Sequence, residues 1–207
     1  MSEKKLFASF LVLLATALPA LAGSGGNVLP SSAHPKGYSL SDAAKATAVY
    51  NVGPRDTAQP NWPFYLLADD ATVKPGTSLY IPIFFADDSG VVDPAPFPTN
   101  LNDQDAIADY IIDAVNSFIH SHGVPPSVEI TQFFIEVDGK DTVLDDSYVS
   151  GVTTAPLPDG TPAGTHYIVS GAFLTPLTPG QHTVGIGGII DGEPVVFFEH
   201  AVTVTNK

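Results

Sequence analysis

GGIIDGEPVVFF (residues 187–198) and FFIEVDGKDTVL (residues 133–144) each place an Asp-Gly pair between two apolar runs. Asp and Gly tolerate the positive φ angles of a two-residue type I′ turn, so each stretch predicts a β-hairpin. Short apolar runs broken by Pro, Gly and Asp recur from Ala48 to the end of the chain. This punctuation is typical of a mainly β protein.

We expect eight strands, and their turn signals favour antiparallel sheets in a β-sandwich or jelly-roll-like fold. SLYIPIFFA (residues 78–86) has apolar residues at both odd and even positions, as is typical of a strand buried on both faces. Pro82 has no N–H for a ladder, which indicates an edge or a bulge there. The expected strands are 48–52, 62–67, 78–86, 128–137, 147–153, 165–174, 181–190 and 194–204.

One long amphipathic helix interrupts the strands at about residues 103–121, with Asn102 as the expected N-cap. At 100° per residue its apolar side chains gather on one side and its polar ones on the other, so we expect the helix to pack on a sheet. The apolar set is Ile107, Ile111, Ala114, Val115 and Phe118, and the polar set is Asp105, Asp109, Asp113, Asn116 and His120. A shorter helix is expected in SLSDAAKA (residues 39–46), capped by Ser41.

FIHSHG (residues 118–123) contains two histidines one residue apart, a spacing that chelates metals well on a strand. On a helix, however, His120 and His122 stand about 200° apart. Gly123 suits the left-handed position after a helix, so the motif is interpreted as a helix end. We expect His120 to face solvent and His122 to help seat the helix.

The N-terminus predicts export. Lys4 and Lys5 precede an apolar run and an Ala-Leu-Ala site at residues 20–22, the pattern of a secretory signal peptide. We expect a signal peptide at 1–22, a flexible tether at 23–40, one β-sandwich domain at 41–207, and a secreted protein, extracellular or periplasmic. The apolar run is shorter than the roughly 20 residues of a membrane helix, so no membrane span is expected.

Charge and composition exclude several functions. Without residues 1–22 the chain has 6 basic and 21 acidic residues, a net charge of −15. Such a surface repels nucleic acid. There is no cysteine, so disulfides and thiolate metal ligands are excluded. No metal or nucleotide motif, nucleophile elbow or phosphate-binding glycine loop is present.

Calcium is the one cofactor that we consider. Paired acids follow apolar runs at Asp69-Asp70, Asp87-Asp88 and Asp145-Asp146. Calcium takes about six to eight oxygen ligands, and the last two pairs are the candidate ligands: Asp87, Asp88, Asp145 and Asp146. Paired acids are also common in turns without metal, and the ordered EF-hand loop is absent.

Two other arrangements have catalytic interpretations. Glu136 and Asp138 partly resemble the Glu-x-Asp pattern of jelly-roll glucanases, but Gly139 starts a turn there and a third acid is missing. A histidine with a nearby carboxylate would favour a hydrolase, lyase or isomerase, and the candidates are His166, His182 and His200. For a hairpin without a bulge, His182 and His200 fall on opposite faces.

Aromatic residues favour a binding function. Trp62 and Tyr65 lie in NWPFYLL (residues 61–67), and their rings can stack on a sugar or simply pack in a core. We expect a secreted, non-catalytic β-sandwich that binds or displays an extracellular glycan or surface protein, with calcium as a possible ligand. The alternative is the secreted enzyme with a histidine–carboxylate site.

Four segments resemble a loose group of uncharacterised secreted bacterial proteins. The group has an aromatic-aromatic-Leu strand, a "PaGkaLffPi" strand, an Asp-Gly hairpin and a late "PlpPGeHtv" strand. The resemblance implies an exported β-sandwich and no particular activity. Cysteines that many members carry are absent here. The matching segments are residues 61–87, 135–140, 174–188 and 197–204.

Overall fold

The structure is a computed structural model and describes residues 27–52, 62–89, 96–154 and 164–206. Its helices are α1 (Leu40–Val52) and α2 (Gln104–Ser121), with short 3₁₀ turns at η1 (Pro35–Gly37) and η2 (Asp146–Tyr148). Its strands are β1 (Phe64–Leu66), β2 (Ala71–Val73), β3 (Ser78–Asp87), β4 (Ile130–Val137), β5 (Lys140–Leu144), β6 (Val149–Thr153), β7 (His166–Leu174), β8 (Gly180–Ile190) and β9 (Glu193–Val204).

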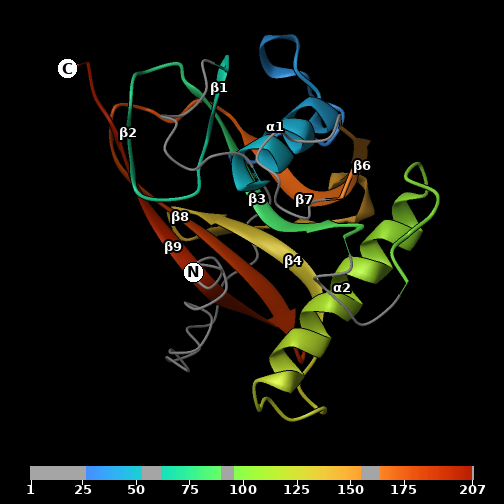
Figure 1. Ribbon diagram of the computed structural model, residues 1–207. Coiled ribbons are helices and arrows are strands. Elements are labelled where there is room, and N and C mark those ends of the chain that lie inside the picture. Colours follow the sequence, from blue (N-terminus) through green and yellow to red (C-terminus); the bar gives the residue numbers. More distant parts are fainter. Residues whose placement is uncertain (1–26, 53–61, 90–95, 155–163, 207) are drawn as a thin grey trace, which may run out of the picture.

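These strands form two sheets, ordered β1-β3-β7-β6 and β2-β9-β8-β4-β5 (Figure 1). The predicted mainly β, sandwich-like fold is confirmed. The expected antiparallel pairing is wrong at two places, because β1 pairs with β3 and β2 pairs with β9 in parallel. The chain passes from one sheet to the other between Leu66 and Ala71, so β1 and β2 do not pair with each other.

Both predicted hairpins are confirmed. Asp138 and Gly139 have φ angles of 52° and 75°, and Asp191 and Gly192 have φ angles of 52° and 83°. All four residues therefore adopt the left-handed conformation that a type I′ turn requires. The turns join β4 to β5 and β8 to β9 after two residues each. They hold four strands of the five-stranded sheet in register.

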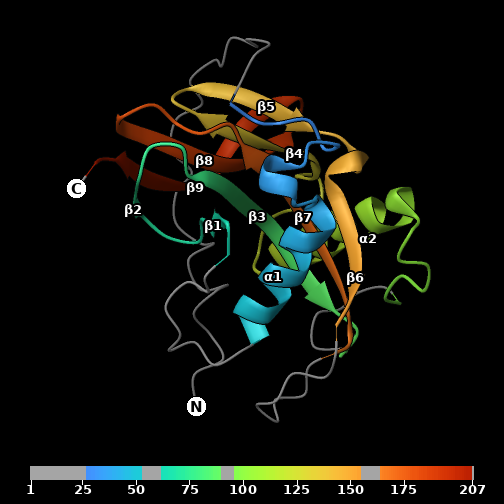
Figure 2. The ribbon, with the colours of Figure 1, turned by 90° about the horizontal axis from the view of Figure 1, so that it is seen from above.

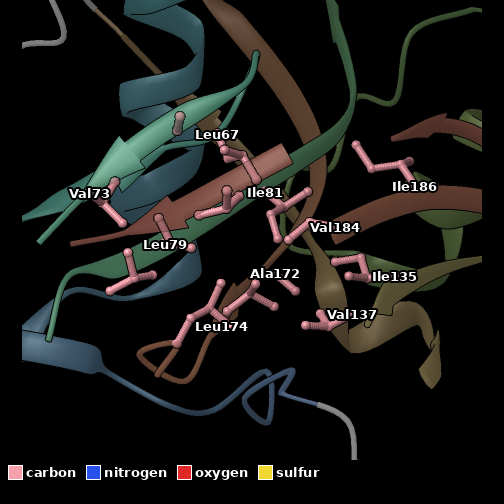
Figure 3. Close-up of a cluster of buried hydrophobic side chains, with 14 of the residues drawn as sticks. Leu67, Val73, Leu79, Ile81, Ile135, Val137, Ala172, Leu174, Val184 and Ile186 are labelled. Atoms are coloured by element: carbon pink, nitrogen blue, oxygen red, sulfur yellow. The ribbon is translucent and has the colours of Figure 1, made fainter. Parts of the chain in front are cut away.

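The main core lies between the two sheets (Figure 3). Leu79 and Ile81 of β3 pack with Ile135 and Val137 of β4 and with Val184 of β8. Each of these side chains is at most 1% exposed. Complete burial of such a side chain stabilises the fold by about 1.5–3 kcal/mol, so this layer is the main source of stability.

The four-stranded sheet is buried on its other face as well. Tyr80 of β3 and Phe173 of β7 point away from the inter-sheet core and pack beneath α1. This confirms the prediction that the 78–86 strand is buried on both faces. The bulge suggested by Pro82 is also confirmed, because the β3–β7 register shifts between Pro82 and Phe84.

Helix α1 covers that second face (Figures 1 and 2). Ala44 and Ala48 are fully buried against β6 and β7, and their small side chains let the helix approach the sheet closely. The predicted strand at 48–52 is wrong, because these residues continue the helix. The cap is also two residues earlier than the expected Ser41: Ser39 and Asp42 form the reciprocal bonds of a capping box.

Helix α2 fills the space between the two sheets beside β4 and β6, where its apolar side packs on Phe84, Phe133 and Ile168. The predicted amphipathic helix is therefore confirmed. Its N-cap is Asp103, whose side chain accepts a hydrogen bond from the N–H of Ala106, rather than Asn102. Gly123 has the left-handed φ of 93° that the predicted helix end requires.

The predicted tether is shorter than expected. Val28 forms an isolated bridge with Leu174, and the N–H of Leu29 donates to the carbonyl of Phe173. Tyr148 also donates its hydroxyl to the carbonyl of Leu29. Residues 28 and 29 therefore belong to the folded domain, whereas residues 1–26, including the predicted signal peptide, lie outside the described residues.

Candidate functional site

A polar groove runs between the C-terminal half of α2 and the start of β4. Its volume is about 550 Å³. Apart from two isoleucines, its lining side chains are polar and include two carboxylates, a histidine, an amide and two hydroxyls. The lining residues are Ile112, Asp113, Asn116, Ser117 and His120 from α2, and Glu129, Ile130 and Thr131 from the segment that enters β4.

Two side chains of α2 fix the geometry of this groove. Asn116 donates its amide N–H to the carbonyl of Ile130 at 3.0 Å and accepts the N–H of Ile130 at 2.8 Å. It therefore pairs with β4 as a neighbouring strand would. The Nε2–H of His120 donates to the carbonyl of Val128 at 3.0 Å. Both bonds attach the polar face of α2 to the segment before β4, so the groove is preformed.

Thr131 enters the groove through a bulge. The β4–β8 register shifts between Ile130 and Gln132, which leaves Thr131 as the extra residue. A bulge re-aims the side chain of the extra residue and is common beside functional sites. Thr131 also donates to the carbonyl of Ile189 at 3.3 Å. The sequence contains no turn signal that would have predicted this bulge.

Negative charge dominates the groove. Asp113 on the helix and Glu129 in the segment that enters β4 are exposed. Within the described part of the chain, neither forms an ion pair. The chain has no Lys or Arg between Lys74 and Lys140. Lys140 pairs with Val137 at the other end of β4, so it does not reach the groove.

The two histidines at the end of α2 differ from the prediction. We expected His120 to be the histidine that solvent could reach and His122 to seat the helix, but His122 is the more exposed of the two, although His120 still lines the groove. His120 is half-buried on Val128, whereas His122 is exposed and caps the helix, with its ring packed on Phe118 at a centroid distance of 4.2 Å. The helical angle of about 200° places the two rings on different sides, but the segment around Val128 folds back over His120 and covers part of it.

A histidine–aspartate pair lies where β3 ends beside the start of β7. His166 Nδ1 is 2.6 Å from Asp88 Oδ2, and the other oxygen of Asp88 accepts the N–H groups of Thr165 and His166. Burial pushes the pKa of Asp88 upward, but these hydrogen bonds outweigh it and hold the pKa below its ordinary value. His166 is 47% exposed.

A second pair joins β8 to the β4–β5 turn. His182 Nδ1 is 2.7 Å from Asp138 Oδ2, and His182 Nε2 is 2.8 Å from the carbonyl of Thr178. Both partners are acceptors, so both ring nitrogens carry a proton and the ring is an imidazolium. The hydrogen bond that the ring donates to Asp138 raises the pKa of His182 accordingly. This histidine has no free nitrogen for catalysis.

His182 and His200 lie on the same face, so the prediction of opposite faces is wrong. His182 pairs with Val202, and Val184 pairs with His200. Directly paired residues point to the same face of a sheet, and so do residues two apart on one strand. Both histidines therefore point to the same face. The cause is a bulge between Ile186 and Gly187, which shifts the register by one residue. Burial lowers the pKa of His200, which favours its neutral form.

Trp62 and Tyr65 do not form one binding face. Trp62 stacks on Phe64 at a centroid distance of 5.8 Å and belongs to the cluster beneath α1. Tyr65 packs against the inter-sheet core instead. Phe64 and Tyr65 are consecutive residues of β1 and point to opposite faces. A sugar platform that uses both rings is therefore not supported by this arrangement.

The calcium candidates occupy separate places. Asp87 accepts hydrogen bonds from Ser89 and Gly164, and Asp88 bonds to His166. Asp145 caps η2 and, with Asp146, lines a cavity of about 40 Å³ beside α2. Among the described residues, no three His, Asp or Glu side chains are placed to hold a metal ion. Calcium binding stays a prediction.

The five-stranded sheet also brings together two carboxyl groups that the sequence patterns did not predict as a pair. Glu136 and Asp141 are cross-strand neighbours in the five-stranded sheet, and Asp141 Oδ1 is buried without a hydrogen-bond partner among the described residues. Burial raises the pKa of both, and the charges of Asp141 and Glu199 raise the pKa of Glu136 further. The two-residue turn at Asp138-Gly139 implies this pairing, so the signal was present in the hairpin register.

No family model, curated protein or solved structure matches this chain. The resemblance to secreted bacterial proteins therefore stays a prediction. Neither α1 nor α2, the helices of the described residues, has the length and hydropathy that a membrane-spanning helix needs.

Proposed function

We propose that this protein is an exported, non-catalytic β-sandwich that binds an extracellular glycan or surface protein at the groove between α2 and β4. The preformed polar groove of about 550 Å³ carries this proposal. Pockets that bind ligands are concave, preformed and lined by a few placed polar groups. The proposal of export rests on the signal-peptide pattern of residues 4–22.

The chemistry of the groove favours binding over catalysis. The hydrogen bond of His120 goes to the carbonyl of Val128 and not to a carboxylate that would orient and activate the ring. Asn116 uses both polar atoms of its amide on the backbone of Ile130. These residues shape the groove, and the remaining polar groups are available to hold a ligand.

An NMR titration of the ¹⁵N-labelled exported protein tests this proposal. The ligands are neutral oligosaccharides, acidic oligosaccharides, basic peptides and calcium. We expect at least one class to shift the amide signals of Ser117, Glu129 and Thr131. Ser117→Phe fills the groove and should abolish those shifts, whereas Ala106→Phe, on an exposed part of α2 outside the groove, should not. Shifts confined to other surfaces would contradict the proposal.

The pair formed by His166 and Asp88 favours a second candidate, a secreted hydrolase. Asp88 orients the ring through Nδ1, as the carboxylate does in a catalytic triad, and leaves the Nε2 side exposed. A panel of chromogenic esters and glycosides tests it. Activity that is lost in His166→Gln but kept in His182→Gln would replace the binding proposal with this one.

A further inference from the structure

Negative charge extends from the groove along α2. Asp105, Asp109 and Asp113 are exposed and follow one another at four-residue spacing on the helix. Like charges at this spacing repel and destabilise a helix. Only Asp105 lies in the first turn, where the helix dipole favours acids. The other two therefore cost stability without a local benefit.

The protein does not neutralise this charge from its own described residues. No Lys or Arg lines the groove, and the chain around it lacks both between Lys74 and Lys140. The groove lies beside the C-terminal half of α2, where the partial negative charge of the dipole also favours cations. A cationic ligand would reduce the repulsion between the carboxylates and would also interact favourably with the negative end of the helix dipole.

The carboxylates are arranged for several cationic groups rather than for one ion. Asp113 comes from α2 and Glu129 from the segment that enters β4, and the described His, Asp and Glu side chains do not form a metal-binding group of three. Extended ligands with charges at intervals can satisfy separated carboxylates. Lys and Arg side chains have this geometry, because their long stems carry the charge away from the backbone.

We infer that the groove receives an extended peptide segment of a partner protein that bears lysine or arginine side chains. This inference rests on the proposed function and names its partner's chemistry. Asp113 and Glu129 bind the cationic side chains. The hydroxyls of Ser117 and Thr131 and the second ring nitrogen of His120 meet the amides of the peptide backbone. A polyamine has the cations but no backbone, so it uses only half of these groups.

Fluorescence anisotropy with a labelled 12-residue peptide of alternating Lys and Gly tests the inference on the full exported protein. We expect binding that weakens with added salt because the contacts are charged. The double variant Asp113→Asn, Glu129→Gln should weaken it by about tenfold. The matched control Asp191→Asn, Glu193→Gln removes the same charge at the β8–β9 turn and should change affinity less than about twofold.

Other outcomes overturn the inference in distinguishable ways. Equal weakening by both double variants would mean attraction to the net charge alone. Spermine binding as tightly as the peptide would remove the role of the peptide backbone. A neutral oligosaccharide that shifts the groove amides, where the peptide does not, would overturn the cationic ligand and leave the proposed function standing. If no ligand shifts the amide signals of the groove, both the inference and the proposed function are overturned.

Discussion

The two histidine–aspartate pairs have the same contact and different surroundings. Nδ1 and the carboxylate are 2.6 Å apart at His166–Asp88 and 2.7 Å apart at His182–Asp138. In both pairs the second carboxylate oxygen also accepts backbone N–H groups, those of Thr165 and His166 at Asp88 and that of Thr183 at Asp138. The side chain of His182 is 11% exposed and that of His166 is 47% exposed.

The difference lies at Nε2. In His182 this nitrogen donates to the carbonyl of Thr178, so the ring connects the β4–β5 turn to the loop before β8. In His166, whose side chain is 47% exposed, Nε2 forms no hydrogen bond to the described residues. The pair at His182 is therefore a structural crosslink held at both ring nitrogens, whereas the ring of His166 is held at Nδ1 alone.

Replacing Asp138 should have the largest effect on stability. Asp138→Asn keeps a residue that tolerates φ of 52° but removes the charge that faces the His182 imidazolium. Hydrogen bonds to charged groups contribute roughly 1.5–3 kcal/mol, so we expect a loss of about 2 kcal/mol in the free energy of unfolding. Urea unfolding at pH 6 measures it.

Asp191→Asn is the matched control. Asp191 occupies the same position of the other type I′ turn, with the same φ, and bonds to no histidine that the structure describes. We expect a change of less than about 0.5 kcal/mol there. Equal losses in the two variants would show that the turn, and not the crosslink to His182, is responsible.

The pH dependence of stability should report on the pair formed by His182 and Asp138. The pKa of His182 is raised above its ordinary value of 6.5 in the folded protein, so folding favours the protonated ring. This contribution is complete below pH 6.5 and is lost as the pH rises through the raised value. Urea unfolding from pH 5.5 to 9 should show a decline that His182→Gln reduces. An unchanged decline in His182→Gln would assign it to another group.

Much of the fold could be predicted because its signals are local. The Asp-Gly turns, the Pro82 bulge and the polar and apolar sides of α2 each depend on residues close in sequence. The strand expected at 48–52 was wrong because Ala44 and Ala48 select a helix only through their fit against β6 and β7. That fit is a tertiary contact, so no periodic pattern in the sequence predicts it.

The candidate site depends on contacts that local patterns do not contain. Asn116 was placed on the polar side of the helix, but its partner Ile130 follows fourteen residues later through the turn after α2. Asp88 meets His166 only through the β3–β7 register. The bulge at Ile186 reversed the predicted face of His200. One unpaired residue is enough to move every side chain beyond it to the other face.

The exposed pair should contribute less than the crosslinked one. In Asp88→Asn the amide can still accept the backbone N–H groups of Thr165 and His166 and can place its own N–H against the ring. Exposed ion pairs contribute roughly 0.2–1 kcal/mol, so we expect a loss of about 0.5 kcal/mol in the free energy of unfolding. Guanidinium unfolding at pH 6 measures this against Asp138→Asn. A loss as large as that of Asp138→Asn would remove the distinction between the two pairs.

A third aspartate extends the comparison, because Asp141 faces a carboxyl group instead of a histidine. Burial raises the pKa of Asp141 and of Glu136, so folding favours their protonated forms. Both are neutral in either state at low pH, and the cost of ionising them in the fold appears as the pH rises through and above the ordinary carboxyl range.

Asp141→Asn removes one of these charges and offers Glu136 an amide donor. We therefore expect a gain of roughly 0.5 kcal/mol at pH 7, kept small because both groups are partly exposed and solvent screens them. The gain should shrink as the pH falls through the ordinary carboxyl range, because folding favours the protonated forms of both groups. Paired urea curves at pH 7 and pH 3.5 measure it. Destabilisation at pH 7 would mean that ionised Asp141 has a favourable partner, and that an aspartate beside a carboxyl group behaves like one beside a histidine.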